Sequence, residues 1–126
     1  MNVRRLGWVG TRTDQVEGMT SFLRDVLGLA LVRVGKDLTV FQLPDGSKVE
    51  VFAMSENQHF TTGPVVEFLV DDVVAATDEL RAAGVPIVDG PIEWPGDEDV
   101  AWVHFRAPDG NIYGLTQGRD LEPPDD

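Results

Sequence analysis

The sequence predicts an α+β fold in which tandem β-α-β-β-β modules form a curved mixed sheet around a cleft. The stretch FQLPDGSKVEVF at 41–52 returns 64 residues later as FRAPDGNIYGLT at 105–116, so the chain contains an internal repeat. A helical apolar pattern and several short alternating segments accompany each copy, which is typical of helices combined with antiparallel hairpins. Neither four-stranded half closes a sheet well alone, so the halves are expected to pack edge to edge and enclose a ligand cleft.

The whole chain, 1–126, is expected to be a single domain. Its 126 residues and 13.8 kDa match the usual size of one domain, and an apolar share of 42% is enough for a core. Module one is expected at about 5–54, a polar linker at 55–63, and module two at about 64–117. A frayed, solvated tail is expected at 118–126.

Module one is expected to begin with a strand and a helix. LGWVGTRT at 6–13 alternates as a strand does, and Asp14 stands at the N-cap position, three residues before Glu17, with the spacing of a capping box. Apolar residues then follow helical spacing over 15–27, and Gly28 is typical of the residue after a helix. Three strands are expected at 29–34, 37–43 and 47–54, with Pro44-Asp45-Gly46 as the last hairpin turn.

Module two is expected to repeat this order. A strand at 64–70 precedes a helix that is capped by Asp71 or Asp72 and ended by Gly84. Further strands are expected at 85–88, 101–107 and 111–117. The stretch DGPIEWPGDED at 89–99 is rich in Pro, Gly and acidic residues, so we expect a loop there, either a lid over the cleft or an ordinary surface loop.

Charge and composition exclude several classes of function. The net charge of −12, from 22 acidic and 10 basic residues, repels phosphate backbones, so no nucleic-acid partner is expected. The same field attracts cationic ligands, although it also serves solubility alone. No apolar run is long enough to span a membrane, and the N-terminal residues lack a signal-peptide pattern. With no cysteine for disulfides or thiolate sites, we expect a cytoplasmic protein.

The chain resembles the vicinal oxygen chelate superfamily, the fold of glyoxalases, bleomycin resistance proteins and extradiol dioxygenases. The resemblance rests on FLRDVLGL, LPDGSKVEVF, VEFLVDD and FRAPDGNIYGL, which occur in the family's order, and it spans about residues 5–117. It implies paired β-α-β-β-β modules. Because this fold serves many reactions, the resemblance implies much less about chemistry.

Metal-dependent members of this family hold a divalent ion with one side chain from each of four strands. The resemblance places those positions on Trp8, Glu50, Val65 and Gly114, of which only Glu50 has the chemistry of a ligand. One carboxylate does not hold Zn²⁺, Ni²⁺, Mn²⁺ or Fe²⁺, so we expect no metal and no cofactor. In character the chain is closest to metal-free, bleomycin-resistance-like binding proteins, which implies a homodimer.

The candidate ligand-binding residues are aromatic, acidic and neighbouring side chains that are expected to face the cleft. They are Trp8, Glu50, Phe60, Val65, Glu67, Trp94, Trp102, His104 and Gly114. Tryptophan rings stack flat or cationic ligands, although Trp8 equally well fills the space that a metal site leaves. His104 is either a proton-shuttling group or a half-buried strand histidine. The other histidine, His59, is expected to face solvent from the linker.

Glu50 is the candidate residue for which the sequence allows the most different roles. A carboxylate between apolar walls has a raised pKa unless a cation such as Arg12 or Arg33 pairs with it. It therefore binds a basic ligand group, acts as a general base, or is an inherited remnant that is paired with Arg12 or Arg33. The favoured function is sequestration of a small, cationic or aromatic molecule. The alternatives are a lyase, isomerase or dioxygenase-like enzyme that uses Glu50, Glu67 and His104 for acid–base chemistry, and a regulatory module with a vestigial cleft.

Overall fold

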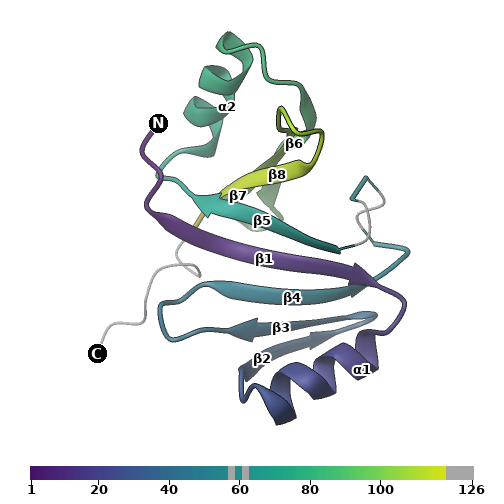
Figure 1. Cartoon of the computed structure of the whole chain (residues 1–126). Coiled ribbons are helices and arrows are strands. Elements are labelled where there is room, and N and C mark those ends of the chain that lie inside the picture. Colours follow the sequence, from purple (N-terminus) through teal and green to yellow (C-terminus); the bar gives the residue numbers. More distant parts are fainter. Residues whose placement is uncertain (57–58, 61–62, 119–126) are drawn as a thin grey trace.

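The computed structural model of the chain describes residues 1–56, 59–60 and 63–118 (Figure 1). The elements of module one are β1 (Arg5–Thr13), α1 (Val16–Ser21), the π-helical turn η1 (Phe22–Val26), β2 (Ala30–Gly35), β3 (Leu38–Gln42) and β4 (Lys48–Ala53). Those of module two are β5 (Gly63–Leu69), α2 (Val73–Ala82), β6 (Ile87–Trp94), β7 (Asp97–Arg106) and β8 (Ile112–Gln117). No helix among the described residues has the length and apolar character needed to cross a membrane.

The strands form one mixed sheet in the order β2-β3-β4-β1-β5-β8-β7-β6. Each module contributes four consecutive strands, and the modules meet where β1 pairs with β5 in antiparallel orientation, at the centre of the sheet in Figure 1. Within each module the first strand lies parallel to the last, β1 to β4 and β5 to β8. The predicted α+β class and the paired β-α-β-β-β arrangement are confirmed.

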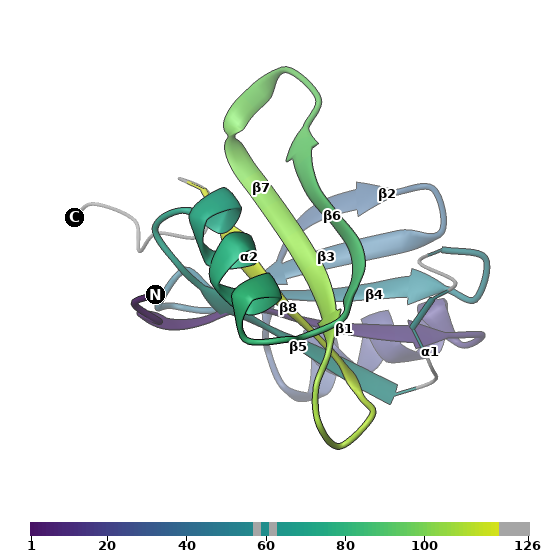
Figure 2. The same cartoon turned by 90° about the horizontal axis from the view of Figure 1, so that it is seen from above.

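Each helix packs on the strands of its own module, as Figures 1 and 2 show from two directions. Helix α2 turns Val73, Ala76 and Thr77 toward the sheet, where these side chains are almost fully buried. The apolar periodicity that predicted the helix is therefore the face that closes the core of module two. Between the two modules lies a third apolar cluster that includes Phe52 and Val65.

The repeated Pro-Asp-Gly turns have the same geometry. Gly46 and Gly110 both have a φ of 88°, a left-handed conformation that side-chain-bearing residues rarely adopt. In the first turn Asp45 accepts a hydrogen bond from the backbone N–H of Ser47 at 2.9 Å, and in the second Asp109 accepts one from Asn111 at 3.0 Å. The repeat in the sequence is therefore a repeat of backbone structure.

The expectation of a loop at 89–99 is wrong. Strand β6 continues to Trp94 and β7 begins at Asp97, so the stretch is most of a hairpin. Its proline and acidic residues are tolerated because β6 is an edge strand, where one side of the backbone needs no ladder partner. Register shifts along β6 accommodate the Gly-Pro pair at 90–91.

The predicted cap of the first helix is also wrong. The N-cap is Gln15, with no side-chain cap, and its backbone N–H instead bonds the hydroxyl of Thr13 at 3.1 Å. The last turns of this helix are π-helical rather than α-helical. In the second helix the structure decides between the two predicted caps, because Asp72 accepts from the backbone N–H of Ala75 at 3.0 Å.

The two aspartates make a matched pair for a stability measurement. Replacing Asp72 with Ala leaves an N–H of the first turn of α2 without its partner, so the free energy of unfolding should fall by about 1 kcal/mol. Asp14→Ala removes no cap bond and should change it by no more than about 0.5 kcal/mol. Urea denaturation of both variants checks the difference, and equal losses would contradict the assigned caps.

Candidate functional site

A cavity of about 560 Å³ opens between the two modules, with its wall made by residues from both. Seven of the nine predicted ligand-binding residues line it: Trp8, Glu50, Phe60, Glu67, Trp94, Trp102 and His104. Arg33, which was named as a candidate partner of Glu50, also lines the cavity, together with residues that the sequence did not single out, among them Lys48, Glu56 and Thr116. The cavity therefore combines indole rings and carboxylates with two cationic side chains, Arg33 of β2 and Lys48 of β4.

The remaining two predicted residues lie outside this wall. Val65 is buried among Phe52, Phe60 and Ile112 in the cluster between the modules. Gly114 lies beneath the side chain of Glu67, since a Cβ built on the glycine would be 2.6 Å from the Glu67 Cγ. Both residues therefore contact side chains that line the cavity, Phe60 and Glu67.

Trp8 packs on one side and faces the cavity on the other. Its ring stacks on Phe52 with centroids 6.1 Å apart, and Phe60 is 6.3 Å away. The ring also covers Gly10, where an added Cβ would be only 1.9 Å from it, so this arrangement requires glycine. Trp8 thus fills core space and leaves an aromatic surface on the cavity.

Glu67 and His104 form a buried pair across the missing side chain of Gly114. Gly114 is the register partner of Glu67 on β5 and of His104 on β7. Through the space above it, Glu67 Oε2 lies 2.7 Å from His104 Nε2, and the two residues are 6% and 3% exposed. Burial raises the pKa of Glu67, and the hydrogen bond to His104 opposes this.

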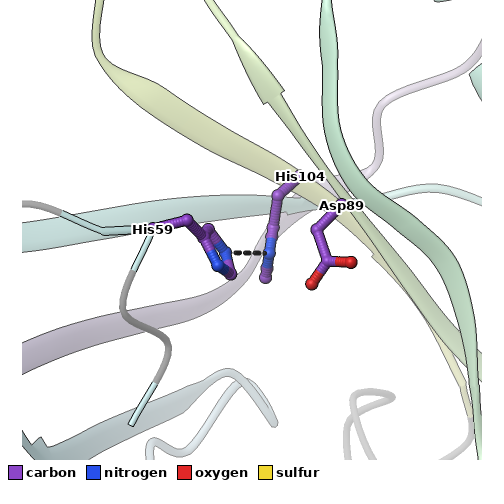
Figure 3. A group of neighbouring side chains, drawn as sticks. All are labelled: His59, Asp89 and His104. Carbon is purple, nitrogen blue, oxygen red and sulfur yellow. Dashed lines mark hydrogen bonds between the residues drawn. The ribbon is translucent and has the colours of Figure 1, made fainter. Parts of the chain in front are cut away.

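The other ring nitrogen of His104 contacts His59, so His59 is partly buried and does not face solvent alone as expected. His59 Nε2 lies 2.8 Å from His104 Nδ1, and Asp89 of β6 stands beside them in Figure 3. Arg12 binds the described backbone around His59, because its guanidinium donates to the carbonyls of Met54, Glu56 and Phe60. Burial and the nearby His104 lower the pKa of His59.

The pKa of Glu50 is raised to about 7. Burial is the main cause and the nearby Glu67 adds to it, while a hydrogen bond from Trp8 and the charge of Arg33 act in the opposite direction. Neither predicted arginine pairs with this carboxyl group. Arg12 holds the linker, and Arg33 lies over the ring of Trp94, 5.3 Å from its centroid. The predicted raised pKa is therefore present.

The residues at the four positions that metal-dependent relatives use do not fit a metal ion. Trp8 is committed to an aromatic cluster, Val65 is apolar and Gly114 offers no side chain. Elsewhere, His59, Asp89 and His104 bring three potential ligand atoms within 4.8 Å of one another. The sequence did not reveal this group, because it joins the linker to a strand that was expected to be a loop.

Comparison with known proteins agrees with the fold. The family model described as "Glyoxalase/Bleomycin resistance protein/Dioxygenase superfamily" matches residues 5–113. Among curated proteins no sequence matches the chain. A single-residue variant of the methylmalonyl-CoA epimerase from Streptomyces coelicolor, in complex with 2-nitronate-propionyl-CoA, has a TM-score of 0.74 at 14% identity, covering 94% of this chain and 99% of its own.

Two further solved structures have the same architecture. A methylmalonyl-CoA epimerase in complex with methylmalonyl-CoA and NH4+ has a TM-score of 0.70 at 17% identity, with 98% of this chain and 100% of that chain covered. A superfamily member from Vibrio splendidus 12B01 has a TM-score of 0.66 at 17% identity, with 93% and 100% covered. At such low identities these likenesses show the fold alone.

Replacing Gly114 with Ala should disrupt the buried pair. The new Cβ would lie 2.6 Å from Glu67 Cγ, so the glutamate must leave its place or the strands must separate. We expect a loss of about 1–3 kcal/mol in the free energy of unfolding, measured by urea denaturation. Gly18→Ala is the matched control, because nothing lies within 4 Å of its Cβ in helix α1 and alanine favours helix by up to about 1 kcal/mol. An unchanged Gly114→Ala protein would refute this packing.

The Glu50 carboxyl group should make stability depend on pH. Its folded pKa of about 7 lies above the ordinary value of 4.5, so its contribution is fully present below pH 4.5 and is lost as the pH rises through 7. The loss is on the order of 3 kcal/mol by pH 8. Glu50→Gln should therefore be more stable than the wild type at pH 8 and similar at pH 4.5. Denaturation at both values checks this, with exposed Glu17→Gln as a control that keeps the wild-type slope.

Proposed function

The chain belongs to the glyoxalase/bleomycin resistance protein/dioxygenase superfamily, and from that membership and the cavity we propose that it binds a small, flat, cationic organic molecule. The ligand would lie in the cavity, without a metal at the four positions that metal-dependent relatives use. The observation that carries the proposal is Glu50, a half-buried carboxyl group on a tryptophan-lined wall. Among the described residues, no arginine or lysine forms an ion pair with it.

The cavity offers both recognition elements that an aromatic cation needs. The rings of Trp94 and Trp102 lie 6.0 Å apart and inclined by 57°, so they present two faces to one ligand. Trp94 already carries the guanidinium of Arg33, which indicates that this ring suits a cation. Glu50 and Glu56 add acidic groups, and the net charge of −12 favours the approach of cations.

We further propose that the chain is a single domain and acts as a cytoplasmic homodimer. The single eight-stranded sheet supports one domain. Apolar side chains on the outer strand β2, Val32 and Val34, are 50% and 70% exposed, which supports contact with a second copy. The lack of cysteine supports a reducing compartment.

A second candidate function is proton transfer to and from a bound substrate. It is favoured by the pKa of Glu50, because a general base is most effective when its pKa lies near the working pH. The Glu67–His104 pair on the same wall would supply a second group for the returning proton. In this case Glu50 removes a proton from the substrate, and the substrate is released after reprotonation.

Benzyltrimethylammonium should bind in the cavity and quench tryptophan fluorescence. Glu50 has a pKa of about 7, so its carboxyl group is mostly neutral at pH 6 and mostly ionised at pH 8. The affinity for this cation should therefore rise about fivefold or more between these pH values. Glu50→Gln should abolish the rise. Neopentylbenzene, in which carbon replaces the ammonium nitrogen, is the matched neutral probe and should bind without pH dependence.

Two results would decide against this proposal. Equal affinity for the cation and its neutral isostere would show that the carboxyl group does not select charge, and no saturable quenching would show that the cavity takes no such ligand. Deuterium incorporation into a bound acyl thioester in D2O, lost in Glu50→Gln while binding is retained, would favour the proton-transfer function instead.

A further inference from the structure

We propose that His59, Asp89 and His104 bind one divalent transition-metal ion of the zinc class. The three side chains come from the linker, β6 and β7, whereas the family's metal positions lie on β1, β4, β5 and β8. The site is therefore new in position. It shares His104 with the cavity wall, whereas His59 and Asp89 do not line the cavity, so variants of these two residues test the metal site separately from the proposed ligand.

The three ligand atoms are already close to the spacing that an ion requires. One nitrogen from each histidine and one oxygen of Asp89 all lie within 4.8 Å of one another (Figure 3). An ion at about 2.0–2.2 Å from each ligand places tetrahedral neighbours about 3.3–3.6 Å apart. The longest separation therefore has to shrink by no more than about 1.2–1.5 Å, while the 2.8 Å between the two histidine nitrogens opens slightly.

His104 is held in the orientation of a ligand by Glu67. Metal-binding histidines usually donate their second ring N–H to a carboxylate, which fixes the tautomer and turns the other nitrogen toward the metal. Here His104 Nε2 lies 2.7 Å from Glu67 Oε2, deep in the protein. If Nε2 donates to Glu67, the lone pair of Nδ1 is turned toward His59, beside which Asp89 lies within the same group. Glu67 is thus a positioning residue for the site.

The fold brings the other two ligands to His104 by different means. Asp89 is the direct register partner of His104 across the β6–β7 hairpin, between two register shifts of β6. His59 is carried by the linker that Arg12 binds. Phe60 packs against both histidine rings, at 4.5 and 4.7 Å between centroids. Arg12 and Phe60 thus help to position the ligands without being ligands themselves.

The ligand set indicates which ions would bind. Two imidazoles and one carboxylate suit Zn²⁺, Co²⁺, Ni²⁺ and Fe²⁺, whereas Mg²⁺ and Ca²⁺ prefer oxygen ligands. Three protein ligands leave at least one coordination position for water, as in catalytic rather than structural zinc sites. His59 and Asp89 are only partly buried, so solvent and ions reach the site.

Metal titration of chelator-treated protein tests the site. We expect one equivalent of Zn²⁺ by calorimetry with a Kd below about 1 µM, and visible absorption bands on addition of Co²⁺. Asp89→Asn and His59→Ala should weaken binding about 100-fold, and Glu67→Gln about 10- to 100-fold. Glu93→Gln, which alters an exposed carboxylate on the same strand as Asp89, is the matched control and should bind as the wild type does.

Nuclear magnetic resonance of the wild type gives a readout that needs no variant. The chain has two histidines, so their ring nitrogens are resolved without ambiguity. Zinc should shift Nδ1 of His104 and Nε2 of His59, while His104 keeps its Nε2 proton. Weak binding of several ions, with Mg²⁺ as effective as Zn²⁺, would overturn the proposal. So would tight binding that survives Asp89→Asn and His59→Ala, or a hydrogen bond between the histidines that zinc leaves intact.

Discussion

The hydrogen bond between Glu67 and His104, which passes over Gly114, is the contact on which the candidate site in module two depends. It requires three adjacent strands in fixed register, with β8 between β5 and β7 and no side chain at its crossing point. A buried carboxyl group is costly unless it is hydrogen-bonded, and His104 supplies that partner. The absence of a side chain at 114 is therefore as important as the residues that flank it.

This contact is part of a row of residues that crosses the sheet. The register partners run in sequence through Lys48, Trp8, Glu67, Gly114, His104 and Asp89, from β4 to β6. Side chains that are register partners project from the same face of a sheet. The row consequently places an indole, a carboxyl group and an imidazole side by side on the cavity wall, and it ends at Asp89 beside the paired histidines.

The sequence predicted the parts that depend on local pattern. Both Pro-Asp-Gly turns, and a helix cap at Asp71 or Asp72 of which the structure uses Asp72, follow from residues that are close in the chain. It failed where tertiary contacts decide. The acidic stretch at 89–99 forms a hairpin because it lies at the sheet edge, and His59 turns inward because Arg12 binds the backbone of its linker. Neither the edge position nor that long-range bond has a signature in nearby residues.

The mismatch between Glu50 and Gly114, which are equivalent in the repeat, has a structural explanation in their neighbours. In module one the register partner of Glu50 is Gly10, and in module two the partner of Gly114 is Glu67. Each module thus keeps one glutamate and one glycine on its paired parallel strands, but in exchanged positions. In each module the glycine makes room for a large side chain, Trp8 over Gly10 and Glu67 over Gly114.

Because of this exchange, the carboxyl groups of Glu50 and Glu67 have different environments. Both line the cavity, but Glu67 lies over its glycine and is bound to His104, whereas the hydrogen-bonding partner of Glu50 is the indole of Trp8. A group held in this way has a pKa near neutrality because burial is only partly offset. The repeat that builds the fold therefore also produces two chemically different carboxyl groups, one that orients a histidine and one that is available to a ligand.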